Sequence, residues 1–524
     1  MKRKGFIISL IRLAILDALI VYITLPTISI HNVGLWLLVL INAVLITVAY
    51  SLTVPVNALN KKLKTPGIII CVLVLAILAG GISSARLFHA SAYSSLLDIS
   101  ISQSAELPTA DKISKIPLMD TESSKMLGNR KIGALNEIVS QFEVSDDYMT
   151  ISYKNEPVKV SALKYAGFWK WNANKKSGIP GYVLVKPNDL TAEYIELKEG
   201  MKYVPSAFFS HDLARHIYFK YPTVFFDNLH FEITEEGKPV YVASTYEYTI
   251  GLFGGKKITG AIVVDPVNGD VNRYALNDLP SWLDIVYNGD YIAKYFDIYG
   301  RLINGYWNSW FGQKGLIEST TTTSYNSDGD TVRDHDFGYI IEKDDVIVYT
   351  GVTAVTNDES NIGYLMANER TGEVSVSYFE STDEDSVMRA AEGEVQEKGY
   401  RASFPSLIDI NGKPAYVMVL KDKLGLVKMY AIVDAAQYSH MIVADSLDRA
   451  LAQFTNGNIS GADLQEKVIV IKKVAIIGSG EPVVYVVDMD NNIYSSAFQP
   501  EYLLLEEGQE ITILTDGSVF KLKD

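Results

Sequence analysis

The sequence predicts an α+β protein, in which three N-terminal transmembrane helices precede extracytoplasmic repeats of antiparallel sheet plus helix and a small C-terminal β-barrel. Three observations predict this architecture. The first 90 residues hold three long apolar runs, a turn-and-strand motif occurs twice further along, and the last 60 residues alternate short strands with turns. The 524 residues allow about three or four folded units. The single Cys excludes a disulfide framework.

The three apolar runs cover residues 6–30, 33–56 and 67–87. Each has about 20 residues or more, which is the length that a helix needs to cross about 30 Å of hydrocarbon. Three such runs in succession, with short links between them, predict a three-helix membrane anchor at residues 1–90. Because two more spans follow the first run, it is not expected to be a cleaved signal peptide.

The basic residues of this anchor predict its orientation. Residues 2–4 are all Lys or Arg and 61–64 contain three Lys, whereas the link around Asn32 has neither. Lys and Arg stay on the cytoplasmic side of a membrane. We therefore expect a multi-pass protein of the cell membrane with a cytoplasmic N-terminus and a large extracellular part after Leu87. Residues 91–524 carry 39 basic and 61 acidic side chains, a net charge of −22, which argues against a nucleic-acid partner.

Two ionisable residues, Arg12 and Asp17, lie inside the first apolar run. Arg12 is expected to extend toward the headgroups, and Asp17 to bond a polar neighbour such as Asn42. The alternative is that both mark a contact with another subunit of a membrane complex. Cys71 lies in the third run and is expected to be a small packing residue.

The exported part begins with a polar, Ser-rich segment. Residues 91–142 are predicted to form a stalk with one helix at 128–142. Residues 143–204 contain short strand patterns and predict a small β-rich domain.

A motif repeats in the centre of the chain. Gly-Lys-Pro-Val-Tyr-Val at 237–242 recurs as Gly-Lys-Pro-Ala-Tyr-Val at 412–417. Gly permits a tight turn there, and Pro fixes φ at the entry of the next strand. Helical patterns precede the two copies at 212–221 and 385–400. Since the strands alternate apolar and polar residues, each copy predicts a sheet with one buried face that a helix covers.

The boundaries of the central domains follow from this repeat. Residues 205–290 are predicted to form a first α+β repeat, 291–362 a strand-rich insert, and 363–456 a second repeat. Residues 282–287 and 446–454 are expected to form closing helices.

A second hairpin signature also recurs, as Asp-Pro-Val-Asn-Gly-Asp-Val at 265–271 and Asn-Glu-Arg-Thr-Gly-Glu-Val at 368–374. Together with the Gly-Lys-Pro motifs, this pattern resembles the PepSY domain, a small α+β module of exported bacterial proteins. The resemblance covers residues 205–455 with interruptions, and it implies a protein-binding or peptidase-modulating module. The copies diverge, the insert separates them, and no peptidase domain accompanies them. The whole chain also resembles large surface proteins of Gram-positive bacteria.

Residues 464–524 differ from the repeats. Short turns separate five strand patterns, which lie at 466–477, 483–488, 493–498, 510–514 and 519–522. Their even spacing predicts a small barrel of the OB or SH3 type.

Familiar catalytic and cofactor motifs are absent from the sequence. Asn326, Asp328 and Asp330 alternate like calcium ligands, but Thr331 and Phe337 stand where an EF-hand needs Gly and Glu. His211 and His216 are five residues apart, which does not suit a helical metal pair. The chain has no GxSxG, GxGxxG or P-loop pattern. We therefore assign no catalytic, cofactor-binding or metal-binding residue and no cofactor.

Aromatic residues cluster at 306–311, in a stretch with the composition of a loop. Tyr306, Trp307, Trp310 and Phe311 lie among Asn and Gly residues there. Aromatic side chains in a loop are hard to bury, so these four residues are our predicted contact surface.

These observations favour a non-enzymatic function. We expect a membrane-anchored extracytoplasmic scaffold or binding protein of the bacterial cell envelope that engages a protein, peptide or glycan and modulates a peptidase or envelope complex. The alternative is an extracytoplasmic hydrolase or cell-wall-modifying enzyme whose site the sequence does not reveal.

Overall fold

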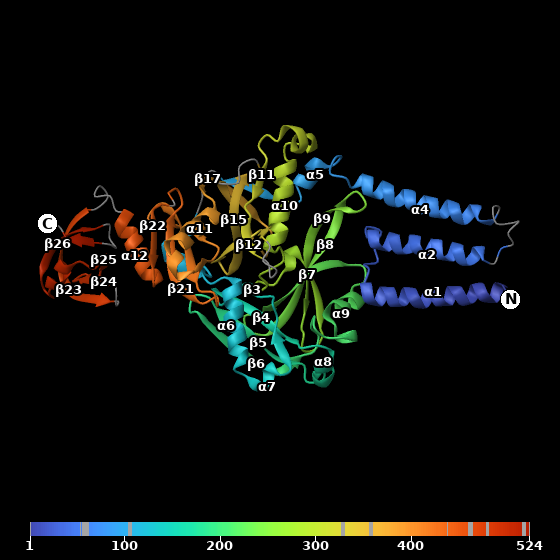
Figure 1. Cartoon of the computed structure of the whole chain (residues 1–524), viewed down its shortest axis with the longest axis horizontal. Helices are drawn as coiled ribbons and strands as arrows, with labels where there is room; N and C mark the ends of the chain where they lie inside the picture. The colour runs from blue at the N-terminus through green and yellow to red at the C-terminus, as the bar shows by residue number, and fades with distance from the viewer. Residues whose placement is uncertain are drawn as a thin grey trace.

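The computed structural model of the protein describes residues 2–52, 54, 62–102, 107–325, 331–355, 360–437, 439–458, 465–477, 482–515 and 520–522. Three helices project from one end of an elongated body, and the C-terminus lies at the opposite end (Figure 1). Helices and antiparallel sheets alternate along the body, which confirms the mixed α and β composition.

The projecting helices are α1 (Lys2–Thr24), α2 (Val33–Ser51) and α4 (Lys64–Ser83). Each has a stretch of 19 or 20 residues that is long and apolar enough to cross a membrane. Almost none of these residues is buried within the protein, so the apolar side chains face outward, as lipid requires. Asn42 Nδ2 donates to Asp17 Oδ1 at 3.0 Å and joins α1 to α2. The predicted bond of Asp17 is therefore confirmed.

In four stretches of the body, a helix precedes strands that belong to one sheet, and most neighbouring strands of each stretch pair in antiparallel fashion. We number these four stretches as units 1 to 4. Unit 1 is α6 (Thr121–Gly133), β2 (Phe142–Val144), β3 (Met149–Tyr153), β4 (Glu156–Tyr165), β5 (Ile179–Lys186) and β6 (Thr191–Met201). Unit 2 is α9 (Leu213–Lys220), β7 (Phe225–Ile233), β8 (Pro239–Ile250), β9 (Gly254–Val264) and β10 (Val271–Ala275). Unit 3 is α10 (Gly289–Leu302), β14 (Gly338–Glu342), β15 (Asp345–Ala354), β16 (Ser360–Asn368) and β17 (Val374–Thr382). In unit 3, three further strands lie between the helix and β14. Unit 4 is α11 (Glu384–Glu394), β18 (Arg401–Ala402), β19 (Ser406–Ile410), β20 (Lys413–Lys421), β21 (Val427–Asp434) and β22 (Met441–Ala444).

The turns of units 2 to 4 use the local chemistry expected from the sequence. Gly237 and Gly412 have φ values of +75° and +78°, which Gly adopts without strain, and each begins a Gly-Lys-Pro turn. In the second signature, Asp265 Oδ1 accepts from the backbone N–H of Val267 at 2.8 Å. Asn368 Oδ1 accepts from the residue two positions further on in the same way. The recurring sequence patterns therefore mark recurring hairpin turns.

The end of α1 is bonded to unit 2. Arg215 of α9 donates through Nε to the carbonyl oxygen of Tyr22 at 3.2 Å, and its guanidinium lies 4.4 Å from the centre of the Tyr22 ring. Tyr218 Oη donates to the carbonyl oxygen of Pro26 at 3.1 Å. These bonds fix the first span to the body.

The tip of the β8–β9 hairpin is bonded to the other two spans. His31, just before α2, donates through Nδ1 to the carbonyl oxygen of Leu252 at 2.8 Å. The backbone N–H of Phe253 donates to Ser84 Oγ, at the end of α4, at 2.8 Å. Gly80 leaves room for this hairpin, because a Cβ there would lie 2.5 Å from the Phe253 ring. Unit 2 thus contacts the ends of all three helices.

The described residues between 91 and 142 are part of the folded body and not the stalk that we predicted. Strand β1 (Ile99–Ser102) pairs in parallel with β17, and Ile116 is fully buried. The predicted helix at 128–142 is wrong as a single element, because α6 already begins at Thr121 and a short separate helix, α7, covers Asn136–Val139. The side chain of Asp120 accepts from the N–H of Ser123 at 2.8 Å, which explains the earlier start.

The predicted closing helix at 282–287 is also wrong. The backbone N–H groups of Asp284 and Ile285 donate to the Glu232 carboxylate, and those of Val286 and Tyr287 donate to the carbonyl oxygen of Glu369. These long-range bonds hold the segment in a non-helical conformation. The helix of this region is α10, which lies in the stretch that we predicted as a strand-rich insert.

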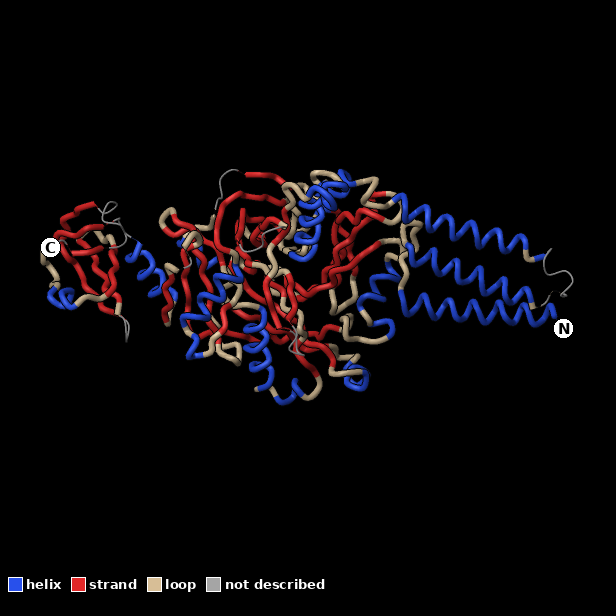
Figure 2. Tube along the Cα trace, turned by 45° about the horizontal axis from the view of Figure 1, so that its top comes forward, coloured by secondary structure: helices blue, strands red, loops and turns tan. Residues whose placement is uncertain are grey.

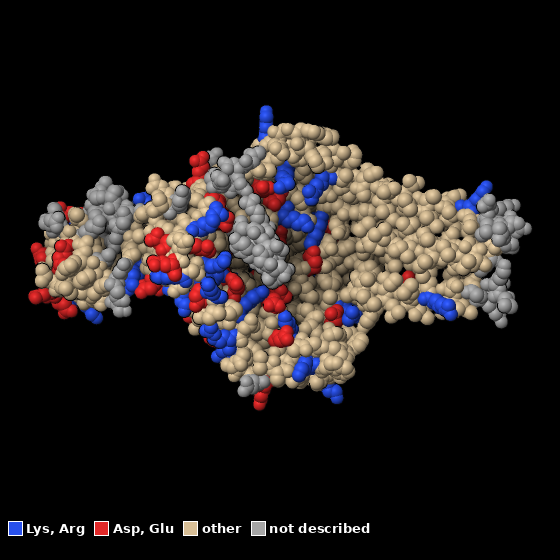
Figure 3. All heavy atoms as spheres, in the orientation of Figure 1, with Lys and Arg blue, Asp and Glu red and all other residues tan. Residues whose placement is uncertain are grey.

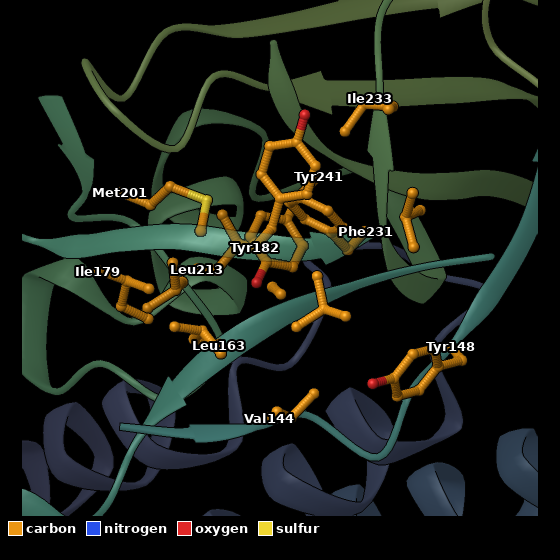
Figure 4. Packing of buried hydrophobic residues seen from close by; sticks show 14 of the residues in the cluster. Val144, Tyr148, Leu163, Ile179, Tyr182, Met201, Leu213, Phe231, Ile233 and Tyr241 are labelled. Atoms are coloured by element: carbon orange, nitrogen blue, oxygen red, sulfur yellow. The ribbon is translucent and has the colours of Figure 1, made fainter. Parts of the chain in front are cut away.

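Units 1 and 2 share one hydrophobic core (Figure 4). The Phe231 ring lies 5.5 Å from that of Tyr182 in unit 1 and 5.4 Å from that of Tyr241 in unit 2. Tyr182 Oη also donates to the carbonyl oxygen of Gly237 at 2.9 Å. Since each sheet buries one face against the other, the two units are expected to fold as one body.

A separate sheet ends the chain beyond α12 (Leu447–Asn458), and both cartoon views place it apart from the other sheets (Figures 1 and 2). Its strands lie within one or two residues of the predicted positions: β23 (Gln465–Ile477), β24 (Val483–Asp488), β25 (Ile493–Ala497), β26 (Glu510–Thr515) and β27 (Phe520–Leu522). The strand order is β25-β24-β23-β26-β27, and the two end strands contact each other. Helix α12 matches the closing helix predicted at 446–454.

Candidate functional site

The four predicted contact residues lie together just after α10, in a loop that contains a short π-helix, Asn308–Gly312, which we did not predict. Asn308 holds this loop closed, because its Nδ2 donates to the carbonyl oxygen of Lys314 at 3.0 Å while its Oδ1 accepts from the N–H of the same residue. Asn304 Nδ2 donates to the same carbonyl at 3.2 Å. The loop therefore has a defined shape although its side chains are exposed.

Three of the four aromatic side chains lie on the surface. Trp307, Trp310 and Phe311 are 63%, 66% and 81% exposed, and Tyr306 is half-buried. The Trp307 and Phe311 rings stack at 5.9 Å, and the Tyr306 ring lies 5.5 Å from Trp307 and 6.4 Å from Trp310. We call these four residues the aromatic loop. Its exposure is as expected, and its role in binding remains a prediction.

Two further aromatic clusters occur in the sequence, at 168–171 and 225–226, and each contributes a buried side chain. Trp171 is 4% exposed and packs against Phe208 and Phe209. Phe225 is also buried. Phe168 and Trp169, at the start of the short helix α8 (Phe168–Asn174), are instead exposed, and Trp169 is the more exposed of the two at 78%.

A second candidate site, which we did not predict, surrounds the first turn of α10. Asn288 caps this helix, because its Oδ1 accepts from the N–H of Tyr291 at 2.9 Å. Two cavities of about 230 and 240 Å³ open beside this cap, and Asn288 and Asp290 line both. The polar residues that line the larger cavity are Thr121, Thr150, Asn288, Asp290, His335 and Glu369. These residues come from units 1 and 3, which therefore meet at this cavity.

Glu369 is the more buried of the two carboxyl groups that line the larger cavity. It is only 2% exposed, and its carboxyl accepts from the backbone N–H of Gly289 at the start of α10. Its Oε2 atom has no hydrogen-bond partner among the described residues. Burial raises the pKa of Glu369 well above its usual range. A buried carboxyl with one free oxygen is costly unless something else bonds it.

A buried lysine lies behind the opposite wall. Lys159 is 2% exposed, and its Nζ donates to Thr150 Oγ1 at 2.7 Å and to Thr121 Oγ1 at 3.2 Å. Burial lowers the pKa of Lys159 to about 8. Lys159 Nζ also lies 5.5 Å from the centre of the Tyr339 ring, which lines the cavity. Among the described residues, Lys159 has no carboxylate within ion-pair distance.

A third polar group, His230, Glu232 and Asp284, has a structural role. Glu232 Oε1 accepts from His230 Nε2 at 2.8 Å, and both its oxygens accept backbone N–H groups. Asp284 Oδ2 accepts from the N–H of Ser152 at 2.8 Å. Burial first, and then the Glu232 charge, raise the pKa of Asp284. These groups face one another and the backbone, and they line neither cavity.

The metal candidates of the sequence are only partly described. Asn326, Asp328 and Asp330 lie outside the described residues. His216 Nε2 lies 2.7 Å from the carbonyl oxygen of Gly269, and the His211 ring stacks on Tyr203. No group of three or more His, Cys, Asp or Glu in the described part of the chain could hold a metal ion.

On the face drawn in Figure 3, Lys, Arg, Asp and Glu gather around a hollow near the middle of the body, whereas the projecting helices show very few charges. The charged side chains of this face therefore lie mainly on the body and not on the three projecting helices.

Comparisons with known proteins assign no family. No family model matches the chain, and no curated protein matches it. Among solved structures, a levansucrase mutant of B. megaterium shares 11% identity over 81% of this chain and 97% of its own, with a TM-score of 0.18. Bacillus subtilis levansucrase shares 9% over 80% and 95% of the two chains, with a TM-score of 0.16. An ACO/RPE65 chimera shares 10% over 58% and 62%, with a TM-score of 0.15. Scores this low carry no argument about fold or function.

Proposed function

We propose that the protein is a membrane-anchored scaffold or binding protein of the bacterial cell envelope, and that its aromatic loop engages a protein partner outside the cell. The observation that carries this proposal is the exposure of Trp307, Trp310 and Phe311 on a closed loop. Trp is among the residues that most often dominate the energetics of protein interfaces, and an apolar centre with a polar rim is typical of such surfaces. Asn304 and Asn308 supply such a rim.

The compartment is part of the proposal. The N-terminus and the link containing Lys62 and Lys64 lie at one end of the spans, and the acidic body lies at the other. By the positive-inside rule, this distribution of Lys and Arg supports an extracellular body. Protease added to intact, wall-stripped cells should degrade the chain beyond residue 90 and spare the link at 61–64. Cleavage in that link would reverse the orientation.

We also propose that the four units are divergent PepSY-like repeats, two more than the sequence alone suggested, and that the C-terminal sheet closes into a small barrel. Support for the repeats comes from the common order of helix and strands and from the recurring turns at Gly237 and Gly412. Contact between β25 and β27 supports closure. PepSY-like modulation of a peptidase is one specific form of the binding function.

Crosslinking in living cells tests the binding proposal. A photo-crosslinking amino acid in place of Phe311 should capture an envelope protein, and Trp307→Ala and Trp310→Ala should weaken that capture at least severalfold. Both variants should keep the free energy of unfolding within about 0.5 kcal/mol of wild type, because these side chains are exposed.

Trp169→Ala is the matched control, since it removes an equally exposed indole from α8. Capture that survives both loop substitutions, or falls equally with Trp169→Ala, would reject the aromatic loop as the contact surface. Capture of a glycan or a peptide in place of a protein would mean that the aromatic loop binds that class of molecule.

The alternative, an extracytoplasmic hydrolase, has one observation in its favour. Glu369 is a buried carboxyl in a cavity, and burial raises its pKa, as in many general acids. Glu369→Gln would then abolish hydrolysis of a cell-wall substrate without loss of fold.

A further inference from the structure

We propose that the 240 Å³ cavity beside the first turn of α10 binds a small zwitterion of amino-acid size, a molecule that carries both an ammonium and a carboxylate group. This inference goes beyond the proposed function, because the aromatic loop lies at the other end of α10 and contributes nothing to the cavity.

The acidic side of the cavity fits an ammonium group. Glu369 Oε2 has no partner in the described part of the chain, while a bond from Gly289 occupies the rest of its carboxyl. Asp290 adds a second carboxylate, and it is exposed at the opening of the cavity. An ammonium placed here would donate to Glu369 and lie near Asp290, so one deep and one outer carboxylate would face it.

The opposite side fits a carboxylate. Thr121 and Thr150 line the cavity and accept hydrogen bonds from Lys159 Nζ. A hydroxyl that accepts from an ammonium still has its own proton to donate. Both hydroxyls can therefore donate into the cavity, with the positive charge of Lys159 directly behind them.

The aromatic wall limits the shape of the ligand. Phe337 and Tyr339 line the cavity, and a Cβ at position 289 would lie 2.9 Å from the Phe337 ring. Gly289 therefore lets this ring lie against the start of α10. The volume suits a molecule of a few heavy atoms beyond its two charged groups, which excludes a polymer.

A metal ion is a weaker candidate for this cavity. No cluster of three ligating side chains occurs among the described residues. The buried Lys159 beside the site would also repel a metal ion, because a metal ion brings no negative charge to pair with the lysine. A zwitterion has a charge for each wall, so it can compensate Glu369 and Lys159 at the same time.

Ligand binding by the full-length protein in detergent micelles tests the proposal. The standard L-amino acids are added one at a time at millimolar concentration, and melting temperature and calorimetric affinity are measured. At least one should raise the melting temperature by about 2 °C or more. The amine and the carboxylic acid obtained by removing one charged group from that amino acid should each lose the effect.

Matched variants locate the binding. Glu369→Gln should weaken affinity by about tenfold or more, because an amide cannot give up a proton to become the carboxylate that pairs with the ligand's ammonium group. Asp290→Asn should weaken the affinity severalfold. Because Asp290 is exposed, this variant is expected to fold, so it can test the proposal even if Glu369→Gln does not fold. Glu384→Gln is the control: Glu384 is equally buried, also has one carboxylate oxygen without a partner among the described residues, and lines neither of the two cavities.

Affinity should stay within about twofold in this control, since a remote substitution leaves the ligand contacts intact. The proposal is overturned if no amino acid changes the melting temperature, which would mean that water alone fills the cavity. It is equally overturned if Glu369→Gln and Asp290→Asn bind as wild type does, or if Glu384→Gln loses binding with them.

Discussion

Glu232 Oε2 accepts a hydrogen bond of 3.1 Å from the backbone N–H of Asp284, although both residues carry carboxyl groups and both are buried. The bond joins β7 to the extended segment that precedes α10. Because this segment ends at Asn288, the cap of α10, the same contact positions the helix start at which the two cavities open. A structural carboxylate in unit 2 thus helps to place the candidate site.

Glu232→Ala should destabilise the protein by about 3 kcal/mol or more, because it leaves two buried backbone N–H groups and the His230 ring without their acceptor. Chemical denaturation followed by circular dichroism measures this change. Glu236→Ala, on the same hairpin but exposed, should cost less than about 0.5 kcal/mol. Similar values for the two variants would contradict the structural role of Glu232.

Glu384 should make stability depend on pH. Burial raises its pKa from 4.5 to about 7, although Asn361 Nδ2 donates to its carboxylate at 3.0 Å. The folded protein therefore keeps a proton that the unfolded chain loses. This contribution is complete below pH 4.5 and is lost as pH rises through 7, a fall of about 3 kcal/mol.

The variant Glu384→Gln cannot ionise, so its free energy of unfolding should not show this fall. The measurement is the difference between wild type and variant at several pH values between 4 and 8. A constant difference over that range would mean that Glu384 titrates normally in the folded protein.

The parts of the fold that depend on local patterns could be predicted from the sequence. The three spans, the hairpins that begin at Gly237 and Gly412, and α12 follow from apolar length, turn residues and periodicity. The segment at 282–287 could not be predicted, because its backbone bonds go to Glu232 and Glu369, about 50 and 80 residues away.

Of the two candidate sites, only the one that depends on local sequence could be predicted. The exposure of Trp307 and Trp310 could be predicted because neighbouring Asn and Gly residues already indicate a loop. The zwitterion cavity could not, because Lys159 and Glu369 come from different units and have no common spacing. The nearest local signal is Asn288 before an amphipathic helix, and that signal predicts only a helix cap.

Gly80→Val should separate the β8–β9 hairpin from α4. A side chain at this position would meet Phe253 and Leu252 at less than 3 Å, and the hairpin tip would have to move. Hydrogen exchange at the amide of Phe253 should then become at least tenfold faster, because its N–H would lose the Ser84 Oγ acceptor. Gly81→Val is the control, since no atom lies within 4 Å of its added Cβ. Equal exchange in both variants would show that the hairpin does not depend on this contact.

Lys421 links units 1 and 4, since its Nζ donates to both Asp120 and Glu122 at the start of α6. Burial opposes ionisation of Asp120, but the charge and the hydrogen bond of Lys421 outweigh it and hold the pKa of Asp120 below its usual value. Lys421→Met should therefore cost about 1–3 kcal/mol at pH 7, because it leaves the partly buried Asp120 carboxylate at a helix cap without its cation.

A lowered pKa in the folded state stabilises the protein above pH 3.8, and this stabilisation is lost as pH falls through the folded value. The penalty of Lys421→Met should accordingly shrink below pH 4, where Asp120 takes up a proton in the variant. Lys423→Met, two residues away and exposed, should change stability by less than about 0.5 kcal/mol at either pH. A penalty for Lys421→Met that stays constant down to pH 3 would mean that lost packing of the lysine stem, and not the ion pair, holds unit 4 to α6.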